Sequence, residues 1–349
     1  MKAPVIIGTG ISGLSAANYF VDHGIQPIII EAGTIGRTKI CGEFFSYESI
    51  PFLEKWDIPF LEIKKSNFIT PLNNYSFNFP MPYASTQRSM CELELSKRAV
   101  NLGATLYENS LVEEIIPAKQ NNGMHYIKLS SGKVIETNKL IITTSKISNT
   151  AAQTTDIYVG IKSHFTNIDM PNELNMFIIP GAYMGVTYIN SSDVNICCLA
   201  KKKLVDQFES LDLFIQYFIN SHVSLKNLLK NSKQIHDPWL TGTVNAFGKK
   251  NNPNWPNTYF IGDAAATIFP ASGNGLAMGL TAGVMAAEHI INNLQTDFKK
   301  QWHNRYNKRL SYAKILHSLF ISPYKADIAF KITNSFPFIS NIFYKLTRD

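Results

Sequence analysis

Cysteine is scarce in this sequence, and long apolar runs are absent. The 349 residues include four cysteines without a CxxC pair, so we expect neither a metal centre nor a disulfide framework, and a reducing compartment fits best. No stretch approaches the roughly 18 consecutive apolar residues of a membrane span. The apolar N-terminus is short and interrupted by glycines, unlike a secretory signal. These absences favour a cytoplasmic protein that binds no metal.

Charged residues are also few, at 17%, and they are unevenly placed. The net charge is +7, and residues 296–349 contain ten Lys/Arg and three Asp/Glu, a surplus of seven. A basic tail of this kind suits an anionic partner, or it forms the solvated face of helices. We expect no nucleic-acid partner. Peripheral contact of the tail with the inner face of a membrane stays open, as does the oligomeric state.

Three glycines near the N-terminus lie between two β-branched segments. A strand is expected at residues 5–7, followed at once by Gly8, Gly10 and Gly13 in the sequence GTGISG. In a dinucleotide-binding turn, such glycines permit a tight turn, close approach to a pyrophosphate, and close packing of helix on strand. The second strand ends at Glu31, whose carboxylate can bind a ribose diol. The spacing predicts a site for FAD or NAD.

Residues beside these positions complete the first half of the expected site. The main-chain N–H groups of Ile11 and Ser12 open the helix and can bind phosphate oxygens. Ala32 follows the acidic residue at the end of the second strand. We expect all three residues to contact the cofactor.

A second glycine-rich segment lies far along the chain, after an expected strand at residues 259–261 and before a long helix of small residues. It resembles the second motif of glutathione-reductase-like FAD proteins, in which an aspartate binds the ribityl chain and a helix N-terminus points at the flavin ring. Such an N-terminus favours the negative charge of a reduced flavin. The expected cofactor contacts here are Gly262, Asp263, Pro270, Gly273, Asn274 and Gly275. An NAD dehydrogenase has no use for this second site, so FAD is the expected cofactor.

Together these motifs resemble the geranylgeranyl reductase family of flavoproteins, within the para-hydroxybenzoate hydroxylase fold. The resemblance includes the segment Cys41-Gly42-Glu43 and Arg88 before a helix. It implies that Cys41 and Gly42 lie near the flavin ring, that Arg88 contacts the cofactor, and that Val112 lies beside the adenine.

The expected fold class is α/β, with a glutathione-reductase-like FAD-binding Rossmann domain, an inserted antiparallel β-sheet substrate domain and a C-terminal helical segment. The FAD-binding domain is expected to be discontinuous and to comprise residues 1–75, 88–150 and 254–295. The substrate domain is expected at residues 76–87 and 151–253, and the basic helical segment at 296–349.

The substrate domain is expected to contain a sheet over the flavin, covered by helices within residues 204–229. Four of its apolar residues are expected either to line a substrate pocket or to pack in the core. They are Phe177, Ile179, Tyr183 and Val186.

Two residues near the expected flavin ring are candidates for catalysis. Cys41 fits a redox-active thiol, a packing residue beside the ring, or a buried cysteine unrelated to it. Glu43 fits a proton donor, which would need a raised pKa, or a structural role. The histidines, His164 among them, show no spacing of a metal site or a catalytic triad, and none is assigned a catalytic role.

The resemblance implies an FAD-dependent oxidoreductase that reduces, or in reverse desaturates, a C=C bond in a hydrophobic isoprenoid-, polyketide- or lipid-like substrate. NADH or NADPH is the expected electron donor. A monooxygenase that uses NAD(P)H and O2 is the first alternative, although Ser145-Lys146 stand where such enzymes of this fold usually carry Asp-Gly. A non-catalytic FAD-binding scaffold is the second.

Overall fold

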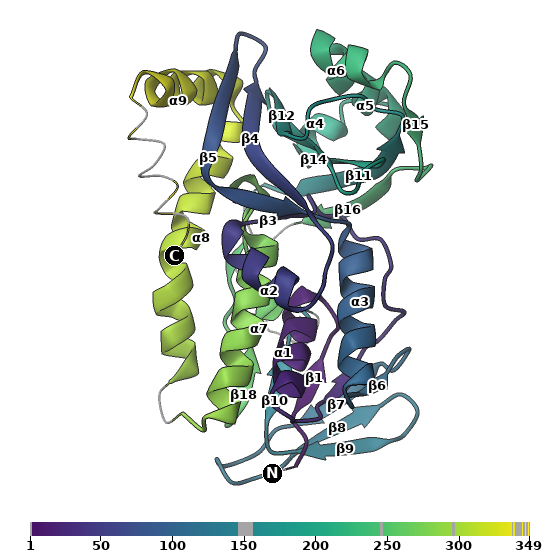
Figure 1. Cartoon of the computed structure of the whole chain (residues 1–349), viewed down its shortest axis with the longest axis vertical. Helices are drawn as coiled ribbons and strands as arrows, with labels where there is room; N and C mark the ends of the chain where they lie inside the picture. Colours follow the sequence, from purple (N-terminus) through teal and green to yellow (C-terminus); the bar gives the residue numbers. More distant parts are fainter. Residues whose placement is uncertain are drawn as a thin grey trace.

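Two sheets lie one above the other in the computed structural model of the chain (Figure 1). The structure describes residues 2–145, 156–244, 247–294, 297–336, and residues 338, 344, 346 and 348. Lys146, the expected domain boundaries near 150 and 295, and the C-terminal Pro337 and Phe343 therefore lie outside the described residues.

The lower sheet has five parallel strands in the order β18-β10-β1-β2-β6. Its strands are β1 (Val5–Ile7), β2 (Ile28–Ile30), β6 (Thr105–Tyr107), β10 (Leu140–Ile142) and β18 (Thr258–Phe260). Both faces of the central strands are buried, which explains why they are short apolar runs without alternation. The parallel Rossmann sheet expected from the sequence is confirmed.

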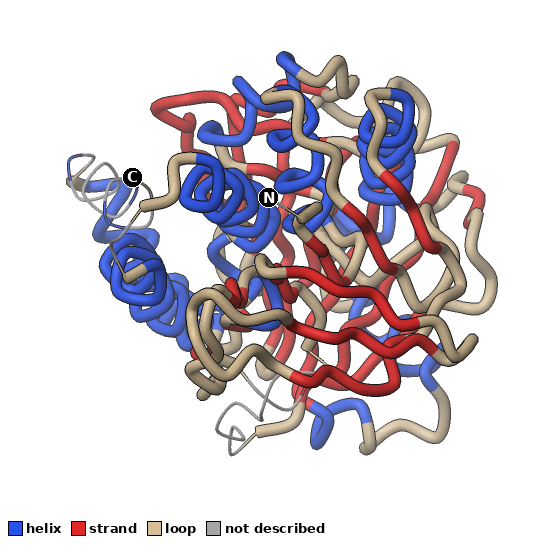
Figure 2. The backbone as a smooth tube through the Cα atoms, turned by 90° about the horizontal axis from the view of Figure 1, so that it is seen from below, coloured by secondary structure: helices blue, strands red, loops and turns tan. Residues whose placement is uncertain are grey.

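Three helices cover one face of this sheet, and a small antiparallel sheet covers the other (Figures 1 and 2). The helices are α1 (Ile11–Asp22), α3 (Arg88–Asn101) and α7 (Gly275–Ile291), and the small sheet contains β7 (Val112–Ile116), β8 (His125–Leu129) and β9 (Val134–Thr137). Along β1, Ile6 packs on the helical side, whereas Val5 and Ile7 pack on the other side.

Helices α1 and α7 are in close contact because α7 is built from small residues. A side chain at Gly283 would overlap Ser15 and the carbonyl oxygen of Ser12. The Ser15 hydroxyl also donates a 3.0 Å hydrogen bond to the carbonyl oxygen of Leu280. The helix that follows the second glycine motif is thereby held directly against the helix that follows the first.

The upper sheet has nine strands, and its main path is β15-β11-β14-β13-β12-β4-β5-β3, with β16 also paired to β11. Every pairing is antiparallel except that of β12 with β4. The strands are β3 (Phe44–Phe45), β4 (Leu61–Ile69), β5 (Asn74–Ser85), β11 (Tyr158–Thr166), β12 (Leu174–Ile179), β13 (Ala182–Tyr188), β14 (Val194–Lys201), β15 (Lys233–Gln234) and β16 (Leu240–Val244).

The upper sheet begins earlier in the chain than the sequence suggested. The β4–β5 hairpin belongs to it, so residues 61–75 extend the substrate sheet instead of the FAD-binding domain. Strand β4 is difficult to predict from sequence because apolar and polar residues do not alternate regularly along it. The pairing with β5 shifts between Ile63 and Lys65, and the buried residue Ser66 is polar.

Three short helices cover one face of the upper sheet. They are α4 (Lys202–Val205), α5 (Leu211–Asn220) and α6 (Val223–Leu229), which lie within or next to the segment expected to be helical. The opposite face is directed toward the FAD-binding domain and the C-terminal helices.

Helices α8 (Phe298–Phe320) and α9 (Pro323–Ser335) form the C-terminal segment, and α2 (Ile50–Lys55) is a short helix near the centre. Helix α8 runs along the side of both sheets, and α9 packs beside the β4–β5 hairpin (Figure 1). Pro323 begins α9, where a missing N–H has no cost. Among the described residues, no helix is long and apolar enough to cross a membrane.

Candidate flavin site

The three N-terminal glycines have different surroundings. Gly8 has a φ of 103° and a side chain there would overlap Thr143, while a side chain at Gly13 would overlap the carbonyl oxygen of Gly8. At Gly10 the nearest atom to an added Cβ is Nη2 of Arg88, 3.8 Å away. Gly8 and Gly13 are therefore required by packing, whereas Gly10 borders open space where a pyrophosphate would lie.

The start of α1 offers hydrogen-bond donors to that space. Gly10 is the N-cap residue, no side chain caps the helix, and no acidic residue occupies its first turn. The N–H groups of Ile11 and Ser12 are at the positive end of the helix, where anions bind favourably.

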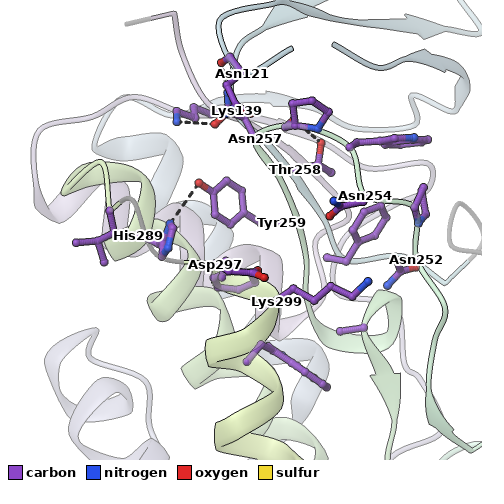
Figure 3. Close-up of a pocket in the computed structure, with 18 of the residues that line it drawn as sticks. Asn121, Lys139, Asn252, Asn254, Asn257, Thr258, Tyr259, His289, Asp297 and Lys299 are labelled. Carbon is purple, nitrogen blue, oxygen red and sulfur yellow. Dashed lines mark hydrogen bonds between the residues drawn. The ribbon is translucent and has the colours of Figure 1, made fainter. Parts of the chain in front are cut away.

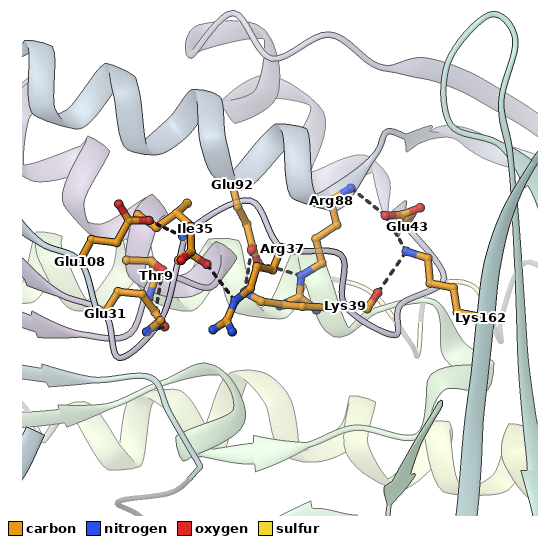
Figure 4. Close-up of polar contacts among 12 residues, drawn as sticks. Thr9, Glu31, Ile35, Arg37, Lys39, Glu43, Arg88, Glu92, Glu108 and Lys162 are labelled. Atoms are coloured by element: carbon orange, nitrogen blue, oxygen red, sulfur yellow. Dashed lines mark hydrogen bonds and ion pairs between the residues drawn. The ribbon is translucent and has the colours of Figure 1, made fainter. Parts of the chain in front are cut away.

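Glu31 follows β2 and faces the same loop. Its Oε2 accepts hydrogen bonds from the N–H (2.9 Å) and the hydroxyl (2.7 Å) of Thr9, and its Oε1 accepts one from the N–H of Gly33 at 3.1 Å (Figure 4). Burial alone would raise the pKa of Glu31, but these hydrogen bonds outweigh burial and lower it. The residue is therefore a carboxylate at neutral pH, as binding of a ribose diol requires.

The expected adenine side lies next to this carboxylate. The N–H of Ser110 donates to the carbonyl oxygen of Glu31 at 2.8 Å, and β7 starts two residues later at Val112. Ala32 is exposed at the beginning of the loop after β2. Ala32 is thus next to Glu31 in the chain, and Val112 follows the segment that is hydrogen-bonded to Glu31 and packs against the cluster that contains Ile30.

The second glycine motif meets the first at the start of α1. Gly262 has a φ of 54°, and a side chain there would overlap the Ser12 hydroxyl. Asp263 follows it and is exposed. A Cβ added at Gly279 on α7 would lie 3.6 Å from the Cβ of Ser12. The two glycine motifs follow β1 and β18, which are far apart in the sequence. They therefore lie together at the carboxyl ends of strands in the lower sheet.

The segment before α7 turns sharply toward this edge. Pro270 begins a single 3-10 turn, and Gly273 takes a left-handed φ of 63°. Asn274 is the buried N-cap residue of α7, and no side chain caps this helix. A cavity of about 40 Å³ is lined by residues of both segments, namely Gly262, Asp263, Ala266, Ile268, Gly275, Met278, Gly279 and Trp302.

These features fit FAD. Open space at Gly10 and the two uncapped helix starts suit a pyrophosphate and a flavin ring, and the ionised Glu31 suits the adenosine ribose. Arg88 forms the wall of this space and is held by an ion pair between its Nε and Oε1 of Glu92, at 2.8 Å.

Glu43 is not built as a proton donor. Burial alone would raise its pKa, but the hydrogen bond from His164 and the charge of Lys162 outweigh burial and lower the pKa. Its carboxylate accepts from the N–H of Arg88 at 3.0 Å and pairs with Lys162 (Figure 4). Of the two roles considered for Glu43, the ionised, hydrogen-bonded state supports the structural one.

Cys41 is half-buried, and its Sγ accepts a 3.4 Å hydrogen bond from the N–H of Glu43. Gly42 between them is exposed, and an added Cβ would meet nothing within 4 Å. The Cys41-Gly42 segment therefore borders open space, as proximity to a flavin ring would require.

Two charged or polar residues of this site were missed by the sequence analysis. Lys162 and His164 on β11 are buried and bind opposite oxygens of Glu43. A lysine and a histidine two positions apart in an otherwise apolar strand point to the same face of a sheet, and this pattern is the signal that could have found them.

The four expected pocket residues do not lie together. Phe177, Ile179 and Val186 pack under α5 and α6 on the far face of the upper sheet. Tyr183 points to the other face, toward the FAD-binding domain. The expectation of a pocket is corrected for the first three, because side chains alternate along β12 and β13 and their positions belong to the helix-covered side.

An aromatic cluster surrounds Tyr183 on the cofactor side of the sheet. The imidazole of His317 on α8 lies 4.6 Å from the Phe269 ring, 4.9 Å from Tyr158 and 5.9 Å from Tyr183, measured between centroids. Burial, with a smaller contribution from Lys201, lowers the pKa of His317 to about 4. Phe269 directly precedes the Pro270 turn, so this buried, neutral aromatic cluster lies beside the segment that leads into α7.

A cavity of about 480 Å³ lies along the outer edge of β18, between residues 250–258 and the connection from α7 to α8 (Figure 3). Lys139, Lys250 and Lys299 make its lining basic, and Trp302 separates it from the smaller cavity at Asp263. It does not touch the N-terminal glycine loop. Among the described residues, no group of His, Cys, Asp and Glu could hold a metal ion.

No family model matches the chain, but individual proteins do. Digeranylgeranylglycerophospholipid reductase of Thermoplasma volcanium is 22% identical over 329 residues, covering 87% of this chain and 82% of the relative. Menaquinone reductase of Mycolicibacterium smegmatis is 21% identical, covering 91% of this chain and 84% of the relative.

Solved structures match over nearly the whole chain. The flavin-dependent brominase Bmp2 superposes with a TM-score of 0.83 at 17% identity, covering 98% of this chain and 92% of that one. A geranylgeranyl bacteriochlorophyll reductase-like protein of Thermoplasma acidophilum superposes with a TM-score of 0.69 at 19% identity, covering 99% and 98%.

The paired glycine motifs and the two sheets define an FAD-dependent oxidoreductase with the para-hydroxybenzoate hydroxylase-like fold. Within that class, the relatives named reductases and the reductase-like structure support the geranylgeranyl reductase family, at low sequence identity. The resemblance noted in the sequence is thereby confirmed.

Proposed function

We propose that the protein reduces a carbon–carbon double bond in a hydrophobic, isoprenoid-like substrate. Three matching proteins carry the name of a reductase that acts on digeranylgeranylglycerophospholipid, at 22% identity each. The observation that carries the proposal is the aromatic cluster beside the start of α7, in which Tyr158 and Tyr183 are buried and Phe269 is half-buried. An unsaturated hydrocarbon chain is the chemistry that such a cluster accepts.

In this proposal, some residues of the chain bind the cofactor and others bind the substrate. When bound, FAD supplies the hydride-transfer chemistry. Gly10 and the start of α1 would bind the pyrophosphate, Glu31 would bind the adenosine ribose, and Asp263 with the start of α7 would bind the ribityl chain and ring. The aromatic cluster would keep water from the reacting carbons and orient the chain.

NADH or NADPH is the proposed electron donor. Purified protein loaded with FAD should lose its flavin absorbance when either nicotinamide is added without oxygen. The reduced protein should then transfer two hydrogens to a geranylgeranyl lipid, which mass spectrometry would detect in the product. A product that gains an oxygen atom would indicate a monooxygenase instead, and FAD that neither nicotinamide reduces would indicate a scaffold or a different donor.

We also propose that helix α9 contacts a membrane that holds this substrate. Tyr324, Ile328 and Ile332 recur at every fourth position of α9, and each is at least 47% exposed. The inner side of α9 packs Phe330 onto the aromatic cluster that includes Tyr183. Lys325 and Lys331 flank the exposed row, and this arrangement suits an anionic lipid surface.

The β4–β5 hairpin and α9 form one surface. Asp327 accepts hydrogen bonds from Thr70 (3.2 Å), Asn73 (2.9 Å) and Tyr75 (3.0 Å) of the hairpin, and Leu72 at its tip is 59% exposed. This contact fixes α9 relative to the substrate sheet, so a bound membrane would lie next to the aromatic cluster.

Vesicle flotation tests this contact. Vesicles rich in phosphatidylglycerol should carry the protein, and the double variant Ile328→Ser/Ile332→Ser should bind them much less. Leu213→Ser, at an apolar position on α5 that is 44% exposed, is the control and should float as the wild type does. Failure of the wild type to float, or equal flotation of the α9 variant, would contradict the membrane contact without touching the proposed reaction.

A further inference from the structure

A buried ion cluster joins the segment of residues 39–43 to the upper sheet. Nζ of Lys162 lies 2.7 Å from Oε1 of Glu43, and Nε2 of His164 lies 2.7 Å from Oε2. Exposure is 1% for Glu43, 0% for Lys162 and 2% for His164. Both oxygens of one carboxylate are therefore bound by donors from a single strand, β11.

The upper sheet also binds the backbone on either side of Glu43. The Lys162 ammonium donates a 3.1 Å hydrogen bond to the carbonyl oxygen of Lys39, and the Asn195 amide on β14 donates one of 3.1 Å to that of Cys41. Ile40, between these two positions, fills a hollow made by two glycines: side chains at Gly160 or Gly242 would press against it.

The same carboxylate reaches the FAD-binding domain. Oε1 of Glu43 accepts the N–H of Arg88, the first residue of α3, and the Arg88 guanidinium lies beside Gly10 (Figure 4). Glu43 is thus a direct connection between the substrate sheet and the wall of the expected pyrophosphate site.

Protein stability alone does not explain why these ions are buried. Burying ions is expensive, and a well-packed apolar replacement is often as stable. Glu43 also has a φ of 54°, which is unfavourable for a residue with a side chain and persists where surrounding contacts enforce it. What the contacts do fix is the exposed backbone at Gly42, which borders open space.

We propose that Lys162 and His164 are positioning residues that act through Glu43 to hold the Cys41-Gly42 backbone against the flavin ring of bound FAD. The proposal rests on FAD binding, which belongs to the function proposed above. A loop held in its bound conformation binds more tightly because it loses less freedom on binding. Releasing it should weaken FAD binding and alter the surroundings of the ring.

Four variants test this role, each compared with the wild type. Lys162→Met removes the buried cation, and Glu43→Gln/Lys162→Met removes the charge pair together, so that no ion is left buried without a partner. His164→Gln keeps a donor for Oε2 of Glu43, whereas His164→Leu does not. Lys201→Met is the control, since it removes a partly exposed ion pair with Asp156 from β14 of the same sheet. FAD affinity, the visible absorbance and circular dichroism of bound flavin, and its midpoint potential are the measurements.

Lys162→Met, the double variant and His164→Leu should bind FAD about tenfold more weakly, with shifted flavin spectra and midpoint potential. His164→Gln should restore the wild-type spectrum, and Lys201→Met should not change it. A folded double variant with wild-type FAD affinity, spectrum and potential would overturn the proposal. So would equal behaviour of His164→Gln and His164→Leu. A wild type that takes up no FAD would instead refute the proposed function, before any variant is compared.

Discussion

The lower and upper sheets provide their parts of the site in different ways. In the lower sheet, the site consists mainly of backbone, namely glycines that permit close approach and the N–H groups of two helix starts, with Glu31 and Asp263 as side chains at the strand ends. In the upper sheet, it consists of side chains that emerge from one face of a continuous sheet, among them Lys162, His164 and Tyr183. A backbone site is fixed by where glycine occurs, whereas a side-chain site depends on which face of each strand meets the cofactor.

The comparison predicts that substitution of a tightly packed glycine of the lower sheet causes the largest loss of stability. In Gly13→Ala, the new methyl group would overlap the carbonyl oxygen of Gly8, which cannot move without separating α1 from β1. We expect a loss of about 3 kcal/mol or more in the free energy of unfolding, measured by urea denaturation. Near-wild-type stability would show that helix and strand are not as close as described.

A truncation on the far face of the upper sheet should be similarly costly but should not affect the binding of the cofactor. Phe177 is 3% exposed and packs among the residues under α5 and α6. Phe177→Ala should lower the free energy of unfolding by about 3–5 kcal/mol. FAD titration of the folded variant should give the wild-type affinity. A selective loss of FAD or substrate binding would place Phe177 at the site after all.

The cofactor-facing side of the same sheet should show a pH dependence from His317. Its pKa is about 4 in the folded protein and 6.5 unfolded, so between these values the unfolded chain binds the extra proton. Stability from this residue is present above pH 6.5 and is lost as the pH falls toward 4. Between pH 7 and pH 5 the loss should be about 2 kcal/mol.

His317→Leu removes this titration. The difference in free energy of unfolding between wild type and variant should therefore shift by that amount between the two pH values, whatever other groups titrate. A difference that stays constant with pH would mean that His317 is not held neutral by burial.

The sequence predicted the lower sheet well because each of its elements has a local cause. Gly8, Gly10 and Gly13 with the acidic residue at the end of β2 define a spacing that few other folds need, and the long helix expected after the second glycine-rich segment begins at Gly275. The contact between the two motifs agrees with their local sequence patterns, since only a glycine at position 262 leaves room for the Ser12 hydroxyl.

The upper sheet was predicted less completely because its structure depends on contacts between residues that are far apart in the sequence. A sheet was expected in the substrate domain, but which face of each strand meets the cofactor depends on register, so Phe177 and Ile179 could not be distinguished from Tyr183. The role of Glu43 depends on Lys162, more than a hundred residues away, and no spacing along the chain indicates that contact.

One pair of measurements tests the central claim that the paired glycine motifs form an FAD site: thermal stability and FAD uptake of the wild type and of Gly10→Val. The position borders open space, so the variant should keep the wild-type melting temperature within a few degrees. Its side chain would occupy the pyrophosphate space, and FAD affinity should fall by at least about a hundredfold. A folded Gly10→Val protein that binds FAD as tightly as the wild type would contradict the account.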